Sequence, residues 1–310
     1  MNLLISELTR FRSRRAVVLL LAAGFVLSVV ITSISVWNNR PLGDDELAQA
    51  QTAVDEQVAQ CLDHPRRFGI QEGQTKRCER FVGDPRYFAP RYIEGFGSQS
   101  KNIPLTVMTT MAFMALLAGT TFLGADFASG SLSNTLLFRP NRWEVWLAKI
   151  AAAAIWLTLV AAVTVGVCLG ALALFGANSN GAEPTSEQLQ TLFKRGVAVM
   201  TVVVAAGVLG AALTTALRAT IATAGIVIGY LLVGEALLRG MAQDTVTPWL
   251  ASTRINAMVT SPLRLYSFDE LAEEEKITLL YLWPSAAYLG VLFAIVLALC
   301  AVVFARRDVA

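Results

Sequence analysis

The sequence predicts an all-α polytopic membrane protein, on the basis of its composition, its six long apolar runs and the placement of its basic residues. Of the 310 residues, 55% are hydrophobic and only 15% are charged, whereas a soluble domain usually carries about 25% charged residues. The net charge of +2 is too small to indicate a nucleic-acid-binding protein. The bulk of the chain is therefore expected to lie in a lipid bilayer.

Six runs are long and apolar enough to cross a bilayer as helices, which takes about 20 residues each. The first run follows basic residues, as a signal peptide does. It is longer than the usual apolar region of about 7 to 15 residues, and no A-x-A-like cleavage site follows it, which favours an uncleaved span. The predicted spans are residues 16–37, 103–124, 145–175, 196–217, 219–238 and 279–305.

The basic residues predict the orientation, because loops rich in Lys and Arg tend to stay in the cytoplasm. An even number of spans puts both termini on one side of the membrane. With the termini inside, the inside segments hold ten basic and four acidic residues, a net charge of +6, and the rest of the chain has a net charge of −4. The N- and C-termini are therefore expected to be cytoplasmic.

Residues 38–102, between the first two spans, predict a small external domain. Its first part, 44–62, is rich in Ala, Gln and Glu and is expected to be helical. Cys61 and Cys78 can pair in an oxidising compartment, and a bond across a loop of about 17 residues would contribute roughly 3 kcal/mol. Two free thiols are the alternative. A metal site that also uses His64 lacks a fourth ligand at zinc-like spacing, so no metal is expected.

Three other segments lie outside the predicted spans. Residues 1–15 alternate apolar and charged side chains, which predicts an amphipathic helix lying in the cytoplasmic interface; an ordinary basic flank is the alternative. Residues 176–195 form an external loop. Residues 239–278 are too polar to span, and Trp249 and Leu250 suggest re-entrant or interfacial helices, which are tolerated only where they pack on protein.

The loop 125–144, between the second and third spans, is expected to contain a short cytoplasmic helix. Ser129 or Ser131 can cap its start. Pro140 would end it, because the residue before a proline avoids the helical conformation. With basic residues on both sides of the proline, this helix offers a compact docking surface; a plain connector that only sets topology is the alternative.

Two features inside the spans have both a functional and a structural interpretation. Glu235 is the acidic residue within a predicted span, so it either lines a polar path or is a boundary glutamate that reaches water. Gly166-x-x-x-Gly170 and Gly225-x-x-x-Gly229 are small-residue motifs that allow close helix packing in lipid.

An ordered set of residues runs from the second span into the third: an acidic residue, a Gly-Ser pair, Leu-Leu, a Pro with a nearby Arg, and a Lys that opens the next span. These are Asp126, Gly130, Ser131, Leu136, Leu137, Pro140, Arg142 and Lys149. The segment resembles the signature region of ABC-2 type transporter permeases, with Asp126 in place of the commoner Glu and Ser131 in place of Thr. The start, Glu7-Leu8 followed by Arg14-Arg15, and Pro248-Trp249-Leu250 before the last span resemble the same family.

The resemblance implies the membrane-spanning permease subunit of an ABC exporter in a bacterial inner membrane. It implies two copies of a separate ABC ATPase that bind ATP and Mg, and a second permease that is the same chain or a different one. The ATPase-coupling residues would be Asp126, Gly130, Ser131, Leu132, Arg139, Pro140 and Arg142, and Glu7, Arg14 and Arg15 would lie near the cytoplasmic gate. No Lys follows a Gly as a P-loop requires, so the chain is expected to bind no nucleotide of its own.

Three classes of function are therefore weighed. The leading one is export of a hydrophobic or amphipathic drug, lipid or peptide. The second is a mechanotransmitting or sensory ABC complex that acts on an external protein, suggested by the 65-residue external domain. The third, an intramembrane enzyme, is disfavoured because His64 is the one histidine and lies outside the spans.

Overall fold

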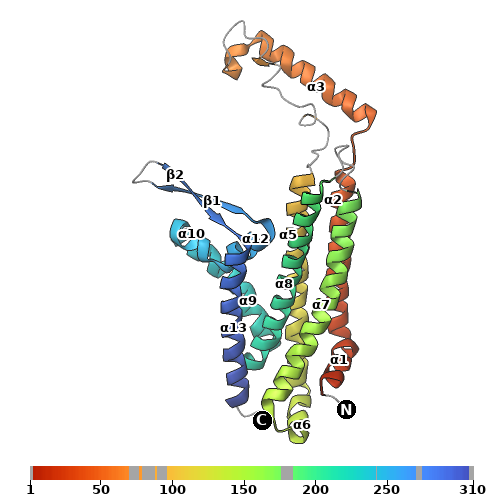
Figure 1. The fold of residues 1–310 in the computed structure, drawn as a ribbon, viewed down its shortest axis with the longest axis vertical. Helices are drawn as coiled ribbons and strands as arrows, with labels where there is room; N and C mark the ends of the chain where they lie inside the picture. Colours follow the sequence, from red (N-terminus) through yellow and green to blue (C-terminus); the bar gives the residue numbers. More distant parts are fainter. Residues whose placement is uncertain are drawn as a thin grey trace.

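The computed structural model describes residues 3–69, 77–78, 88, 96–175, 184–241, 243–269 and 274–306. Long helices run side by side in an elongated bundle with both termini near one end, and helix α3 lies beyond the other end (Figure 1). We call these the terminal end and the α3 end. Six helical segments are long and apolar enough to cross a membrane, in agreement with the predicted polytopic helical protein.

The spanning helices are separated by short elements at both ends of the bundle. The six spanning segments are α2 (Arg15–Asn38), α5 (Phe96–Ala128), α7 (Arg142–Phe175), α8 (Ser186–Leu217), α9 with α10 (Thr220–Gly229 and Glu235–Met241, joined by a π-helical turn, Tyr230–Gly234) and α13 (Leu282–Arg306). The shorter elements are α1 (Leu3–Ser13), α3 (Asp44–Asp63), α6 (Ser131–Phe138), α11 (Gln243–Val246), α12 (Ala251–Thr260), β1 (Leu263–Asp269), β2 (Glu274–Leu280), and the 3₁₀ turns Pro65–Phe68 and Thr247–Trp249.

Several spanning helices extend beyond the apolar runs that predicted them. A hydropathy window stops at the first polar residues, but a helix continues until its backbone is capped. Helix α8 begins at Ser186, where Thr185 and Gln188 bond to each other's backbone N–H groups at 3.3 and 3.0 Å. Part of the predicted loop 176–195 is therefore helical, and residues 176–183 lie outside the described part of the chain.

The bundle centre is built on close contact between α5 and α8. A Cβ on Gly119 would lie 1.9 Å from the carbonyl oxygen of Gly207, and one on Gly210 would lie 2.6 Å from that of Leu116. No side chain larger than hydrogen fits at these positions, which is how small residues bring helices together in lipid. The glycines that the sequence predicted for this role, Gly166, Gly170, Gly225 and Gly229, meet no described atom within 4 Å of an added Cβ, so that prediction is wrong within this chain.

The predicted helix after the first span is present as α3, and its last turns lead to a disulfide. Cys61 and Cys78 are bonded, with their Cα atoms 5.8 Å apart, which confirms the predicted pairing over the free thiols. Both cysteines are buried and pack against Phe68. The bond ties the end of α3 to a point farther along the chain.

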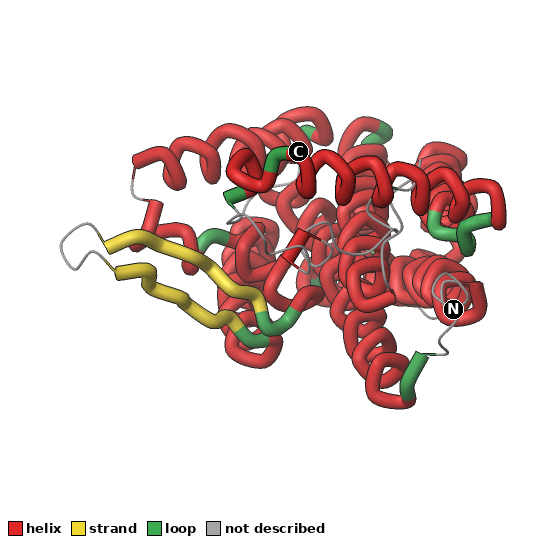
Figure 2. The backbone as a smooth tube through the Cα atoms, turned by 90° about the horizontal axis from the view of Figure 1, so that it is seen from above, coloured by secondary structure: helices red, strands yellow, loops and turns green. Residues whose placement is uncertain are grey.

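The segment before the last span contains an antiparallel β-hairpin, so the all-α prediction is wrong there. Strands β1 and β2 pair with Leu263 opposite Leu280 and Tyr266 opposite Ile277, and the hairpin extends to one side of the helices (Figure 2). Short alternations of apolar and polar residues, Leu263-Arg264-Leu265 and Ile277-Thr278-Leu279, favour strands in this segment. Leu279 and Leu280, assigned to the last span by hydropathy, belong to β2 instead, and α13 begins at Leu282.

Candidate functional site

The first helix is held against the bundle at the terminal end. Phe11 is 2% exposed and meets the ring of Phe122 on α5 edge-on, with ring centroids 4.8 Å apart. The indole N–H of Trp156 on α7 donates to the carbonyl oxygen of Leu8 at 3.0 Å. Helix α1 therefore uses one face to pack on protein, while Ile5 on another face stays exposed.

Four charged side chains meet beneath α1, and we call them the buried charge cluster: Glu7, Arg14, Asp126 and Lys149. The ammonium of Lys149 donates to Glu7 Oε2 at 2.9 Å and to Asp126 Oδ2 at 2.6 Å. Arg14 pairs with the other oxygen of Asp126 and donates to the carbonyl oxygen of Phe122. Glu7, Asp126 and Lys149 are each at most 2% exposed.

The charges in this cluster balance, and that balance is what makes their burial tolerable. Moving an unpaired charge out of water costs several kcal/mol, roughly, so buried charges need partners with good geometry. Two carboxylates face two cations here, and the face of the Phe122 ring lies 5.2 Å from Arg14 and 5.8 Å from Lys149. The cluster joins α1, the start of α2, α5 and α7.

The short helix α6 is attached to the cluster at its first turn. The Ser131 hydroxyl donates to Asp126 Oδ1 at 2.8 Å. Arg10 donates to Glu7 at 3.2 Å and to the Thr135 hydroxyl at 3.5 Å. Gly130, between α5 and α6, has φ +66, a left-handed conformation that glycine adopts without steric cost.

The opposite face of α6 is uncovered. Leu132 is buried against the bundle, but Leu137 and Phe138 are each 81% exposed. Arg139 and Pro140, which follow at the helix end, are exposed as well. The helix ends at Phe138, as the proline predicted. Its last turn thus presents two large apolar side chains next to a basic residue.

The predicted site residues separate into two groups in space. Asp126 and Ser131 from the loop prediction join Glu7 and Arg14 from the N-terminal prediction at one place; the same family resemblance had suggested both sets. The other group lies outside the cluster. Arg15 is exposed, and Arg142 is half-buried and donates to the carbonyl oxygen of Ala305 on α13 at 3.4 Å.

Lys149 is the residue whose importance sequence reasoning missed. It was noted only as the residue that opens a span, yet it bonds both carboxylates of the cluster. The signal was present, since a charged residue inside an apolar span is expensive and usually has a partner. Within the described ranges, no group of three or more His, Cys, Asp or Glu side chains is placed to hold a metal ion.

Glu235 lies away from the cluster, near the α3 end, and is 2% exposed. Its carboxylate accepts hydrogen bonds from the backbone N–H of Ser252 at 3.0 Å and from the Ser252 hydroxyl. Arg239 lies 3.8 Å from the same carboxylate and donates to Ser252 and Thr253. Glu235 therefore caps the start of α12, and its carboxylate does not reach water.

Removing this cap should destabilise the protein locally. We expect Glu235→Ala to lower the free energy of unfolding by about 1–2 kcal/mol, because a free N–H at a helix start is left without its acceptor. Glu235→Gln should cost less, since an amide oxygen still accepts from Ser252. Thermal unfolding in detergent checks both, with Glu56→Ala, an exposed glutamate on α3, as the control; an equal effect of all three changes would refute the cap.

Residues 86–310 match the protein family described as "Protein of unknown function (DUF2705)". The chain belongs to this family. The DUF2705 match includes Asp126, Ser131 and Lys149, whereas Glu7 and Arg14 lie before it. No curated protein and no solved structure matches the chain.

Proposed function

We propose that this DUF2705 protein is the membrane-spanning permease subunit of an ATP-driven exporter, and that α6 docks on a separate ATPase. The observation that carries the proposal is the construction of α6. Its first turn is bonded to a buried charge cluster, and its last turn exposes Leu137 and Phe138 at 81% each. Large exposed apolar side chains beside polar ones are typical of an interaction site.

The resemblance of the Asp126–Lys149 region to ABC-2 permeases supports the same conclusion. In the proposed complex, the terminal end faces the cytoplasm of a bacterial inner membrane. Two copies of the ATPase carry ATP and Mg, and a second permease, the same chain or another, completes the pore. The cargo is a hydrophobic or amphipathic molecule such as a drug, lipid or peptide.

The buried charge cluster gives this proposal a mechanical route. A rigid-body movement of the docked ATPase would displace α6. The displacement would pass through Ser131 and Asp126 to α5, through Lys149 to α7, and through Glu7 to α1, because these side chains are bonded to one another. One short helix would thus move three others together.

Purification of the full-length chain from its native membranes tests the proposal. We expect a soluble protein with a P-loop signature to co-purify, and ATP hydrolysis by that protein to require the permease after reconstitution. Absence of any P-loop partner would contradict the proposal. So would labelling of Arg139→Cys by a membrane-impermeant thiol reagent added outside intact cells.

A mechanotransmitting or sensory ABC complex remains the second candidate, and α3 is the observation that favours it. This helix lies beyond the bundle (Figure 1), and its first turn carries Asp44, Asp45 and Glu46. A helix held apart from the spans and tied by a disulfide suits contact with an external protein. A stable external partner, with ATP hydrolysis that no small molecule stimulates, would favour this function over export.

A further inference from the structure

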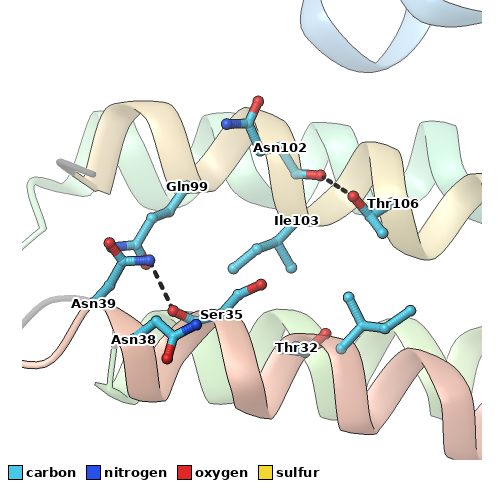
Figure 3. A pocket seen from close by; sticks show the side chains of 9 residues that line it. Thr32, Ser35, Asn38, Asn39, Gln99, Asn102, Ile103 and Thr106 are labelled. Carbon is cyan, nitrogen blue, oxygen red and sulfur yellow. Dashed lines mark hydrogen bonds between the residues drawn. The ribbon is translucent and has the colours of Figure 1, made fainter. Parts of the chain in front are cut away.

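A polar cavity of about 190 Å³ lies between α2 and α5 at the α3 end of the bundle (Figure 3). It sits where the chain leaves the last turns of α2 and enters the first turns of α5, so the segment that carries α3 begins and ends beside it. The cavity is separate from the buried charge cluster, which lies at the terminal end.

The α2 wall of the cavity is a stripe of hydroxyl and amide side chains. Thr32 and Asn39 are buried, Ser35 is half-buried and Asn38 is exposed. The side-chain amide of Asn39 donates to the carbonyl oxygen of Ser35 at 2.7 Å, which fixes that amide at the mouth of the cavity (Figure 3). Residues spaced three or four apart share a helix face, so these side chains line one side together.

On the α5 side, Gln99 and Ile103 point toward α2, whereas the side-chain amide of Asn102 points away from it and donates to the Ser98 hydroxyl at 3.4 Å (Figure 3). The Thr106 hydroxyl donates to the carbonyl oxygen of Asn102 at 2.9 Å. Asn102 and Thr106 are both exposed. The cavity is therefore a groove open to the side, and a molecule can enter it from the surroundings of the bundle.

The donor and acceptor set of the groove is uncharged. The nine described residues that line it carry no ionisable group. Amides offer both donors and acceptors, and hydroxyls do the same, so together they match hydroxyl groups on a ligand. A phosphate or carboxylate would find no cation among these nine described residues to replace its water. At roughly 30 Å³ per water, the volume corresponds to about six waters, which suits a glycerol- or sugar-sized group.

An apolar track runs from the groove along the outside of α2 toward the bundle centre. Ile31 lines the groove, and Ile34 and Leu27 share its face of the helix with exposed fractions of 54% and 43%. Trp37, near the end of α2, is 67% exposed, and tryptophan is enriched where spans meet the membrane surface. The polar groove near the membrane surface matches the headgroup of an amphipathic molecule, and the apolar track beside it matches the hydrocarbon chain.

We propose that this groove binds an amphipathic lipid with an uncharged, hydroxyl-bearing headgroup. The headgroup lies between Ser35 and Gln99, and the chain lies along Ile34 and Leu27 of α2. The proposal requires neither an ATPase nor transport. Its failure would leave the proposed export function standing, and failure to find an ATPase would leave the groove unaffected.

Photo-cross-linking of the full-length chain in phosphatidylcholine nanodiscs tests the proposal. The probes are dodecyl glucoside and dodecyl phosphate, each with a diazirine in the chain. We expect the glucoside to label the segments around 27–38 and 102–113. Its labelling should exceed that of the phosphate about fivefold, because the free energy of roughly one hydrogen bond changes the affinity by about that factor. Free glucose in excess should not compete; full competition would indicate a site for a soluble sugar and overturn the lipid proposal.

Three variants make the test specific. Gln99→Leu and Ser35→Val should each lower glucoside labelling about fivefold by removing one hydrogen-bonding group. Asn38→Lys should instead raise labelling by the phosphate, which a merely structural role for Asn38 would not do. Thr158→Val is the control, because Thr158 is an exposed threonine on α7 whose hydroxyl bonds its own helix, like that of Thr106. Equal labelling by both headgroups, or no change in Gln99→Leu and Ser35→Val, would overturn the proposal.

Discussion

Lys149→Met should lower the free energy of unfolding of the solubilised protein by about 3–5 kcal/mol, the cost of removing one partner from a buried ionic group. Methionine matches the length of the lysine stem, so the change removes charge more than volume. Glu7 and Asp126 would remain buried, at 1% and 0% exposed, without the ammonium that bonds both. Denaturation followed by tryptophan fluorescence measures the loss.

Two further variants separate the effect of the lost charge from the loss of stability that any lysine substitution could cause. Lys101→Met removes an exposed lysine on α5 and should change stability by less than about 0.5 kcal/mol. Lys149→Met combined with Glu7→Gln should be more stable than the sum of the two single changes predicts, because neither residue is then an unpaired buried charge. If Lys149→Met cost no more than Lys101→Met, the cluster would not be a stabilising element.

The pair of changes Leu137→Glu and Phe138→Glu should reduce ATPase binding by at least about tenfold without unfolding the permease. Both side chains are 81% exposed in the chain alone, so their replacement removes little packing. In a docked complex they would be buried, and placing carboxylates there would cost more than the loss of their apolar area. Co-purification of the ATPase and its stimulated hydrolysis measure the effect.

The matched control for α6 is the same chemistry at the other end of the molecule. Leu47 and Leu62 on α3 are also exposed, and their change to Glu should leave ATPase recovery unchanged. Arg139→Glu tests the basic part of the surface. Arg142→Glu would not test docking alone, because Arg142 also donates to a carbonyl oxygen at the end of α13. Retained binding in both the α6 pair and Arg139→Glu would show that α6 is not the docking element.

The agreement between sequence and structure is best where the determining interactions are local. Helix α6 was predicted from residues within one short loop, and it ends where Pro140 requires. The predicted cap by Ser129 or Ser131 is wrong, because the N-cap is Gly130 and the two hydroxyls bond Ala125 and Asp126 instead. The disulfide was predicted from two cysteines in one polar segment. The hairpin was missed because the segment was judged by hydropathy alone, although short alternations of apolar and polar residues occur in both strands, such as Leu263-Arg264-Leu265 and Ile277-Thr278-Leu279.

The helix contacts show that a small-residue motif alone does not predict which glycines lie between helices. Four glycines at the expected spacing contact nothing described within 4 Å of an added Cβ, while Gly119 and Gly207 touch backbone to backbone. Spacing within one helix tells which residues share a face. It does not tell which face meets another helix, because that depends on how all the helices are arranged together.

The sequence by itself determined which segments are apolar enough to cross a membrane, because transfer into lipid is a sum over the residues of one segment. It also determined that a short helix lies between the second and third spans. Only the tertiary structure decided that Glu7 and Lys149, 142 residues apart, bond each other beside Asp126. The energy of a buried ion pair depends on the distance and surroundings of its partners, and these exist only once α1, α5 and α7 have packed together.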